Sequence, residues 1–331
     1  MTELRFIDGI RAALELAMAA DERVTILGED VTVGGPFTAT KGLVERFGPR
    51  RVRDTPISEG TVVGMATGAA LSGQRPVVEI MFIDFITLAM DQLVNHAAKL
   101  RYMSGGQLHV PLVIRAQGGA SGSMGAHHSQ SLEAWFTHVP GLRVVAPATP
   151  ADARDLLRAA VADDDPVVYL EHRALYWLRA EVAEAAPTAP PYGGAEIRRP
   201  GTDVTLVAWS RMVHTALEAA EALAGEGIEA EVVDLRTLRP LDLPTVLGSV
   251  SRTGRCVVVH EAVIEGGFGG ELAARISEAA WDELDGPVLR VGAAFVPPPF
   301  SRPLEAAFVP GSVDVRAAVR RALGETSKVH A

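Results

Sequence analysis

The chain is organised around residues 53–85, which combine a helix without a polar face and a buried strand. Residues 62–71 are small and apolar on every side, which is typical of a helix buried all round rather than an amphipathic one. Residues 76–81 form a short apolar run with β-branched side chains, which predicts a buried strand. Met81 and Phe85 then lie at the end of that strand, so we expect them at one edge of a sheet.

A carboxylate stands at the start of this apolar helix. Pro56 disfavours helix at the residue before it, and Ser58 is a suitable N-cap, so Glu59 lies in the first helical turn. Two interpretations remain open at this point. Glu59 is either an acid favoured by the helix dipole or a functional group at the mouth of an apolar pocket.

The rest of the chain alternates strands with helices. In the first half we expect strands at 24–27, 110–115, 142–146 and 167–171 and helices at 6–20, 84–102 and 151–162. This pattern predicts an α/β fold with a mainly parallel sheet and helices on both faces. A proline-rich stretch, residues 180–201, predicts a linker, and a second strand–helix alternation follows from 204 to 323.

Composition limits the classes of function. The 331 residues predict about two domains. The net charge of −10 argues against nucleic-acid and anionic-membrane partners, and no apolar run reaches the roughly 18 residues of a membrane span. Cys256 is the single cysteine and the N-terminus lacks the layout of a signal peptide, so we expect a reducing, cytoplasmic location.

Two glycine-rich segments attract attention. Residues 117–126 have almost no large apolar side chain and lead into His127 and His128, so this loop suits an acid–base, anion or, less readily, metal site. The segment E-G-G-F-G-G-E-L, residues 265–272, resembles a dinucleotide-binding turn but lacks its third glycine. A glycine turn that packs a helix onto a sheet is the simpler interpretation of that segment.

Several ordered blocks now carry a family resemblance. They read G-E-D, T-K-G-L-x-E-R-F-G, R-V-x-D-T-P-I-S-E, P-V-V-E-I-M-F-I-D-F, A-A-K-L-R-Y-M-S-G-G, H-S-Q-S, P-G-L-R-V-V-A-P and V-D-L-R-T-L-x-P-L-D. Together they resemble the β subunit of the thiamine diphosphate-dependent 2-oxoacid dehydrogenases, pyruvate dehydrogenase in particular. The resemblance implies two three-layer α/β domains: a pyrimidine-binding transketolase-like domain (1–180), a linker (181–201) and a transketolase C-terminal domain (202–331).

The resemblance also implies roles for four side chains. Glu59 would hydrogen-bond the aminopyrimidine ring of the cofactor and activate it, since a carboxyl group in an apolar pocket can share a proton with a ring nitrogen. Phe85 would stack on that ring and Met81 would line its pocket. His128 matches the histidine of H-S-Q and would transfer a proton during reductive acylation of a lipoyl group, whereas His127 departs from the family pattern.

Metal ions are a further implication of the resemblance. Some relatives hold a potassium ion, and here its ligands would be Leu112, Ala160, Val161, Asp163 and Asp165. The alternative is an acidic helix end in solvent. Thiamine diphosphate also needs a cation such as Mg²⁺, but the G-D-G…N segment that holds it in the family is absent from this sequence. We therefore expect Mg²⁺ on a partner α subunit, in an α₂β₂ tetramer that is active only with both chains.

Three functions stay open. The first is a pyruvate dehydrogenase β subunit that serves a complex with a lipoyl acyltransferase core. The second is the β subunit of an acetoin or branched-chain 2-oxoacid dehydrogenase. The third is a non-catalytic scaffold subunit, which the presence of Glu59, Phe85 and His128 disfavours. The segment V-G-A-A-F-V-P-P-P-F-S departs from the family and leaves the mode of docking to the core open.

Overall fold

The computed structural model describes residues 1–185, 192 and 194–324. Its contacts divide these residues into two compact units. Unit 1 comprises the described residues within Met1–Gly118, Trp135–Gly193 and Leu238–Pro240. Unit 2 comprises Gly119–Ala134, Gly194–Thr237 and the described residues within Leu241–Ala331. This division differs from the predicted one, 1–180 and 202–331, at two segments. Gly119–Ala134 belongs to unit 2 although its neighbours in sequence belong to unit 1, and Leu238–Pro240 belongs to unit 1 although its neighbours belong to unit 2.

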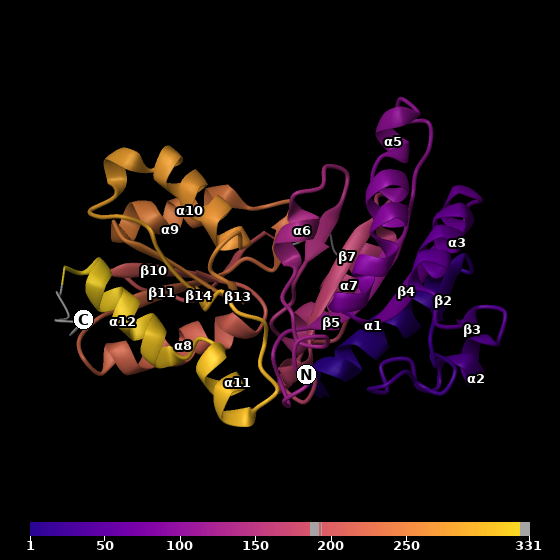
Figure 1. Ribbon diagram of the computed structural model, residues 1–331, viewed down its shortest axis with the longest axis horizontal. Helices are drawn as coiled ribbons and strands as arrows, with labels where there is room; N and C mark the ends of the chain where they lie inside the picture. Colours follow the sequence, from indigo (N-terminus) through magenta and orange to yellow (C-terminus); the bar gives the residue numbers. More distant parts are fainter. Residues whose placement is uncertain (186–191, 193, 325–331) are drawn as a thin grey trace. The chain divides into compact units, whose positions relative to one another are not determined.

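Unit 1 is built on a seven-stranded sheet with the order β12-β6-β7-β5-β4-β2-β3 (Figure 1). The neighbouring pairs from β6 to β3 are parallel, as the alternation of strands and helices predicted. The strands are β2 (Val24–Gly28), β3 (Val52–Asp54), β4 (Arg75–Phe82), β5 (Val113–Gly118), β6 (Arg143–Val145), β7 (Val167–His172) and β12 (Thr237–Arg239).

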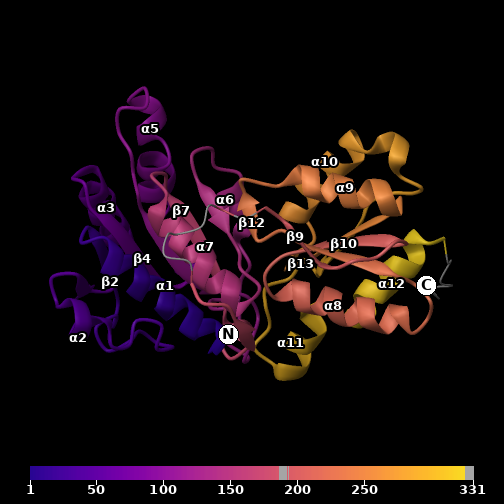
Figure 2. The same cartoon turned by 180° about the vertical axis from the view of Figure 1, so that it is seen from behind.

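Helices α1 (Phe6–Ala20) and α7 (Pro150–Ala162) lie side by side and cover part of this sheet, as both views show (Figures 1 and 2). Helix α3 (Glu59–Leu71) packs on β4 instead. Both α1 and α3 begin where the sequence predicted. Helices α2 (Leu43–Phe47) and α6 (Glu133–Thr137) are short, and the second begins in unit 2.

The helix predicted over 84–102 is broken into four pieces. They are α4 (Ile83–Ile86), a 3₁₀ turn η1 (Thr87–Ala89), a π-helical segment η2 (Asp91–Ala97) and α5 (Leu100–Met103). Helix α3 packs closely along η1 and η2 because it has glycines at the contact: a Cβ atom on Gly64 would lie 3.0 Å from Gln92 Oε1. Local periodicity does not report such a change in backbone hydrogen bonding.

Unit 2 contains a five-stranded sheet with the order β14-β13-β10-β11-β9, parallel except for β9. Helices α8 and α12 cover one face, and α9 and α10 the other (Figures 1 and 2). The strands are β9 (Glu196–Arg199), β10 (Val204–Ala208), β11 (Ala230–Asp234), β13 (Cys256–Val263) and β14 (Leu289–Ala293). The helices are α8 (Arg211–Ala224), α9 (Leu243–Thr253), α10 (Phe268–Ala279), α11 (Arg302–Phe308) and α12 (Ser312–Ala322).

The predicted linker contains more regular structure than its composition indicated. Strand β8 (Arg179–Val182) pairs antiparallel with β1 (Thr2–Arg5), and β9 joins the sheet of unit 2. Residues 186–191 and 193 of this stretch lie outside the described part of the chain. Within the described residues, no helix combines the length and the apolar character that crossing a bilayer requires.

Candidate active site

The carboxyl ends of three parallel strands in unit 1 bring the predicted cofactor residues together. Glu29 follows β2, the chain after β3 leads to Glu59, and Met81 and Phe85 lie at and just beyond the end of β4. Strand β2 pairs with both β3 and β4, so these ends share one edge of the sheet. Functional groups in open α/β sheets gather at this edge.

Glu59 is the first residue of α3, and it is buried with 7% of its surface exposed. Ser58 occupies the N-cap position but makes no cap hydrogen bond; its Oγ donates to Thr61 Oγ1 at 2.7 Å. Gly60 lets this end of the helix approach the η1 turn, since a Cβ atom there would lie 3.2 Å from Leu88 O. The start of α3 therefore lies close to η1, the turn that follows α4 and its Phe85.

A second acid lies close to Glu59. Burial raises the pKa of Glu29, and the charges of Glu59 and Asp30 raise it further. Asp30 has φ +54°, and its carbonyl oxygen accepts hydrogen bonds from Val33 N–H and Gly35 N–H at 3.2 and 2.8 Å. The two acids of the G-E-D loop thus differ in role. Asp30 stabilises a turn through its carbonyl oxygen, and Glu29 is an acid close to Glu59.

Met81 and Phe85 are half-exposed, so both offer apolar surface to a ligand. The register of β4 against β5 shifts between Ile80 and Phe82, and such a bulge re-aims the side chains around it. Phe82 is buried and contacts Phe85 edge to face, with ring centroids 5.6 Å apart. The Arg173 guanidinium lies 5.8 Å from the Phe82 ring centroid, which brings a cation to this aromatic pair.

A buried ionic cluster behind this edge was not predicted from sequence. Arg115 on β5 donates from Nη1 to Glu79 Oε2 and from Nε to Glu171 Oε1, each at 2.7 Å. The Tyr176 hydroxyl donates to Glu171 Oε2 at 2.7 Å. Burial raises the pKa of Glu79. A cavity of about 10 Å³ lies between this cluster, Met81 and the glycine-rich loop after β2.

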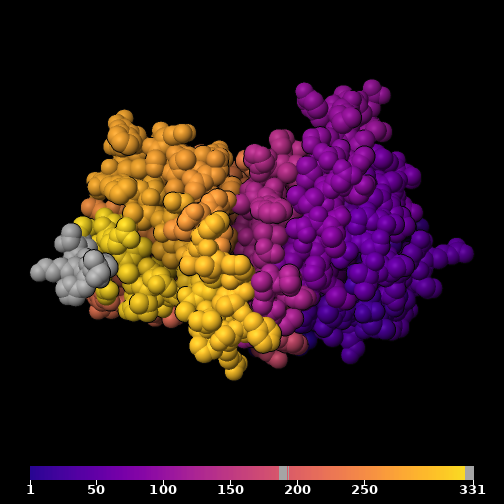
Figure 3. All heavy atoms as spheres, in the orientation of Figure 1, coloured from indigo at the N-terminus to yellow at the C-terminus, as the bar shows by residue number. Residues whose placement is uncertain are grey.

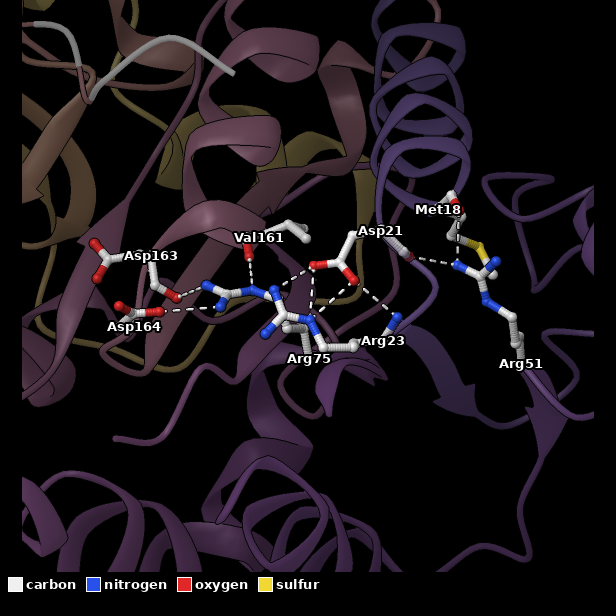
Figure 4. A network of polar contacts seen from close by, with 8 residues as sticks. All are labelled: Met18, Asp21, Arg23, Arg51, Arg75, Val161, Asp163 and Asp164. Carbon is white, nitrogen blue, oxygen red and sulfur yellow. Dashed lines mark hydrogen bonds and ion pairs between the residues drawn. The ribbon is translucent and has the colours of Figure 1, made fainter. Parts of the chain in front are cut away.

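The predicted potassium ligands lie at the end of α7, where arginines already contact most of them. Arg75 donates to Val161 O at 2.8 Å, to Asp163 O at 2.6 Å and to Asp164 Oδ1 at 3.0 Å (Figure 4). The Asp165 carboxylate accepts from Arg101 and Arg143 at 2.6 and 3.0 Å.

The two remaining oxygens accept backbone hydrogen bonds. Leu112 O receives Val167 N–H at 2.8 Å and Ala160 O receives Asp163 N–H at 3.3 Å. Guanidinium groups of Arg75, Arg101 and Arg143 thus already contact this turn. A potassium ion there stays a prediction.

In unit 2, the histidine loop (Gly119–Ala134) presents its two histidines differently. His127 is exposed and lines a cavity of about 520 Å³, together with Ser129 and apolar residues that include Phe295, Pro297 and Phe308. His128 is half-buried, does not line this cavity, and has its backbone N–H on Gly125 O at 3.2 Å.

Near the end of the histidine loop, at the start of α6, lies Glu133, which the sequence analysis did not single out. This carboxyl group has 5% of its surface exposed, and burial raises its pKa to about 7. Trp209 Nε1 donates to Glu133 Oε1 at 3.2 Å. The indole of Trp209 stacks on the imidazole of His260, with an interplanar angle of 3° and centroids 5.6 Å apart.

The glycines of E-G-G-F-G-G-E-L make room for His260. A Cβ atom on Gly267 or Gly269 would lie 2.8 or 2.5 Å from the imidazole, and α10 begins between them at Phe268. The segment is thus a glycine turn that packs a helix onto a sheet, and the close approach of His260 accounts for two of its four glycines without a nucleotide. Among residues 1–185, 192 and 194–324, no set of three or more His, Cys, Asp or Glu side chains is arranged to hold a metal ion.

Comparison with known proteins places the chain in a family. Residues 2–177 match the transketolase pyrimidine-binding domain, and residues 193–315 match the transketolase C-terminal domain. The chain is 45% identical, over 97% of its length and 86% of the relative's, to a mitochondrial pyruvate dehydrogenase E1 component subunit beta-2 from Oryza sativa subsp. japonica. The chain belongs to the β subunits of the thiamine diphosphate-dependent 2-oxoacid dehydrogenases.

Other relatives show the breadth of this β-subunit family. The β subunit of an acetoin:2,6-dichlorophenolindophenol oxidoreductase from Cupriavidus necator is 46% identical over 95% of this chain and 96% of its own length. Among solved structures, a split gene transketolase described as an inactive beta4 tetramer superposes with a TM-score of 0.76, at 26% identity, over 98% of this chain and 99% of its own. Family membership and the two-domain α/β fold are thereby confirmed.

The residues of this β subunit suit the pyrimidine end of the cofactor. One buried carboxylate stands at the start of α3, which packs on β4, and half-exposed Met81 and Phe85 lie at and just beyond the end of β4 in the same unit. An aminopyrimidine requires an acid to hydrogen-bond a ring nitrogen and apolar side chains to pack on its flat ring. The individual roles of Glu59, Met81, Phe85 and His128 stay predictions.

Glu133 gives a pH-dependent test of the histidine loop's environment. Its folded pKa is raised to about 7, so the unfolded chain loses the proton first as the pH rises from about 4.5. The free energy of unfolding therefore falls through this window and is constant above it. We predict that Glu133→Gln, which keeps an acceptor for Trp209, stabilises the protein by about 3 kcal/mol at pH 8 and by little at pH 5.

Denaturant unfolding of both proteins at the two pH values measures this difference, and Glu278→Gln on an exposed position is the control. An equal gain at pH 5 and pH 8 would contradict the burial of an ionisable Glu133.

Proposed function

We propose that this β subunit contributes half of an active site that oxidatively decarboxylates a 2-oxoacid and passes the acyl group to a lipoyl group of an acyltransferase core. The observation that carries the proposal is the convergence of Glu59, Met81 and Phe85 at the carboxyl edge of the unit 1 sheet. Pyruvate is the favoured substrate, because relatives named as pyruvate dehydrogenase β subunits match nearly the whole chain at 43–45% identity.

The chemistry divides between cofactor and protein. Bound thiamine diphosphate would supply the carbon nucleophile and the electron sink. Glu59 would hold a proton at the aminopyrimidine ring, and burial at the start of α3 limits its exchange with water. Met81 and Phe85 would fix the plane of the ring. His128 would deliver a proton to the acyl acceptor from the histidine loop.

A partner α subunit completes the site in this proposal. Unit 1 exposes large apolar side chains, among them Ile57, Met65, Leu88, Tyr102 and Met103. They lie before α3, on it, in η1 and on α5, and α5 stands out from the body of unit 1 in Figure 3. A groove of about 950 Å³ beside α5 adds apolar surface. We propose that the α subunit covers this surface in an α₂β₂ tetramer and holds the Mg²⁺ of the cofactor.

Acetoin is the second candidate substrate, because the acetoin-oxidising relative from Cupriavidus necator is as similar as the pyruvate dehydrogenases and matches over 96% of its length. Assays of the αβ enzyme on pyruvate, branched 2-oxoacids and acetoin separate the candidates.

Cytoplasmic location stays a prediction, since the rice relative is named as mitochondrial. The potassium ion also stays a prediction. A higher melting temperature in KCl than in NaCl at equal ionic strength would support it.

Replacement of Glu59 tests the cofactor-activating acid. Glu59→Gln preserves shape and removes the titratable proton, so we predict a loss of turnover of at least about a hundredfold in the assembled enzyme. Steady-state kinetics with saturating cofactor measure it, and Glu22→Gln on the exposed surface is the control. Near-normal turnover in an intact αβ assembly would refute the role.

The two histidines of the loop are separated by paired variants. Because His127 and His128 have different surroundings, their loss has different effects. We predict that His128→Ala slows acyl transfer to lipoamide by at least about a hundredfold, and that His127→Ala slows it less. Single-turnover transfer rates decide the matter. A larger loss in His127→Ala would reassign the proton donor to His127.

A further inference from the structure

Buried glutamates from distant parts of the chain hold the first half of the histidine loop. Glu261, on β13, accepts Ala120 N–H at 2.6 Å. Glu305, on α11, accepts Ser123 N–H through both carboxylate oxygens, at 2.9 and 3.0 Å. Their side chains lie 141 and 182 residues from the loop in sequence, and the two residues have 5% and 9% of their surface exposed. Charged acceptors make such hydrogen bonds about twice as strong as neutral ones.

The peptide at Ala120 is held from both sides. Arg211, the first residue of α8, donates from Nη1 to Ala120 O at 2.9 Å and lies 3.6 Å from Glu261 Oε2. The Ala120 methyl group is buried against Ala293 and Phe308. The loop thus enters unit 2 through a backbone segment whose donor, acceptor and side chain are all engaged there.

The middle of the loop has a conformation that needs support. Ser123 has φ +57°, a left-handed value that strains the backbone of a non-glycine residue. The two hydrogen bonds to Glu305 fall on this residue, so they offset the strain at the point where it occurs. Gly125 follows with φ +72°, and a Cβ atom there would touch the Phe300 ring at 3.4 Å. His128 comes three residues later.

The end of the loop is fixed by the Trp209–Glu133 hydrogen bond described above, which rests on His260 and its glycines. Every anchor, from Glu261 to Trp209, belongs to unit 2. The contacts within one unit therefore fix both ends and the middle of a segment that follows a strand of the other unit.

We propose that Glu261 and Glu305 are positioning residues for the reaction: they hold the backbone of the histidine loop and so set where His128 lies. This inference rests on the proposed function. It assigns to the C-terminal half a task in catalysis besides assembly, performed by two carboxylates that touch neither substrate nor cofactor. The histidine loop is thus anchored at three points.

The test uses the intact αβ enzyme with Glu305→Ala, Glu305→Gln and the exposed control Glu278→Ala. A hydrogen bond to a charged group contributes roughly 1.5–3 kcal/mol, so its loss should speed exchange of the loop's backbone amides about tenfold to a hundredfold in Glu305→Ala. Hydrogen exchange of residues 119–128 measures this. Glu305→Gln keeps one acceptor and should lie between wild type and Glu305→Ala, and also serves if the alanine variant does not fold.

Kinetics then separate positioning from stability. We expect Glu305→Ala to slow transfer to lipoamide at least about tenfold, with substrate KM unchanged and with partial rescue in Glu305→Gln. Unchanged exchange, or faster exchange without slower transfer, would overturn the inference. Absence of activity in the wild-type enzyme on every 2-oxoacid and on acetoin would instead refute the proposed function, and the exchange data would show separately whether Glu305 holds the loop.

Discussion

The unit 1 sheet depends on one arginine buried between two glutamates. Arg115 bridges Glu79 on β4 and Glu171 on β7, with 2% of its surface exposed. Removing one partner of such a buried pair costs roughly 3–5 kcal/mol, because the remaining charge is left without compensation. Two of the three strands that this cluster joins lead into candidate site residues. Met81 lies at the end of β4 and Phe85 just beyond it, and the histidine loop begins after β5. The cluster thus fixes the register of strands from which the candidate site extends.

Much of this arrangement follows from local sequence. The small apolar helix after Glu59 and the strand before Met81 lie where periodicity placed them, since both are buried and have unambiguous patterns. The broken helix after Ile83 could not be predicted, because its irregularity comes with close packing against Gly60 and Gly64 of α3. Short strands such as β9 are also invisible to periodicity, since they have few residues and mixed polarity.

The residues of the candidate site were predicted only where they lie in a recognisable local motif. Glu59, Met81, Phe85 and His128 lie within motifs, so a family resemblance finds them. Glu261 and Glu305 act through backbone N–H groups far away in sequence, and an isolated glutamate carries no signal of that. The raised pKa of Glu133 likewise arises from burial that only the tertiary structure creates. The glycine-rich segment 265–272 stood out in the sequence, but nothing in the sequence indicated that its glycines pack against His260.

The central claim is that this chain holds the pyrimidine half of a cofactor site and depends on a second chain for the rest. Isothermal titration calorimetry of the single chain with thiamine diphosphate and Mg²⁺, repeated after addition of the α subunit, tests it most directly. The account predicts no tight binding to the single chain and tight binding to the αβ assembly, because the G-D-G…N segment that holds the metal ion in the family is absent from this sequence. Micromolar or tighter binding to the β chain alone would contradict it.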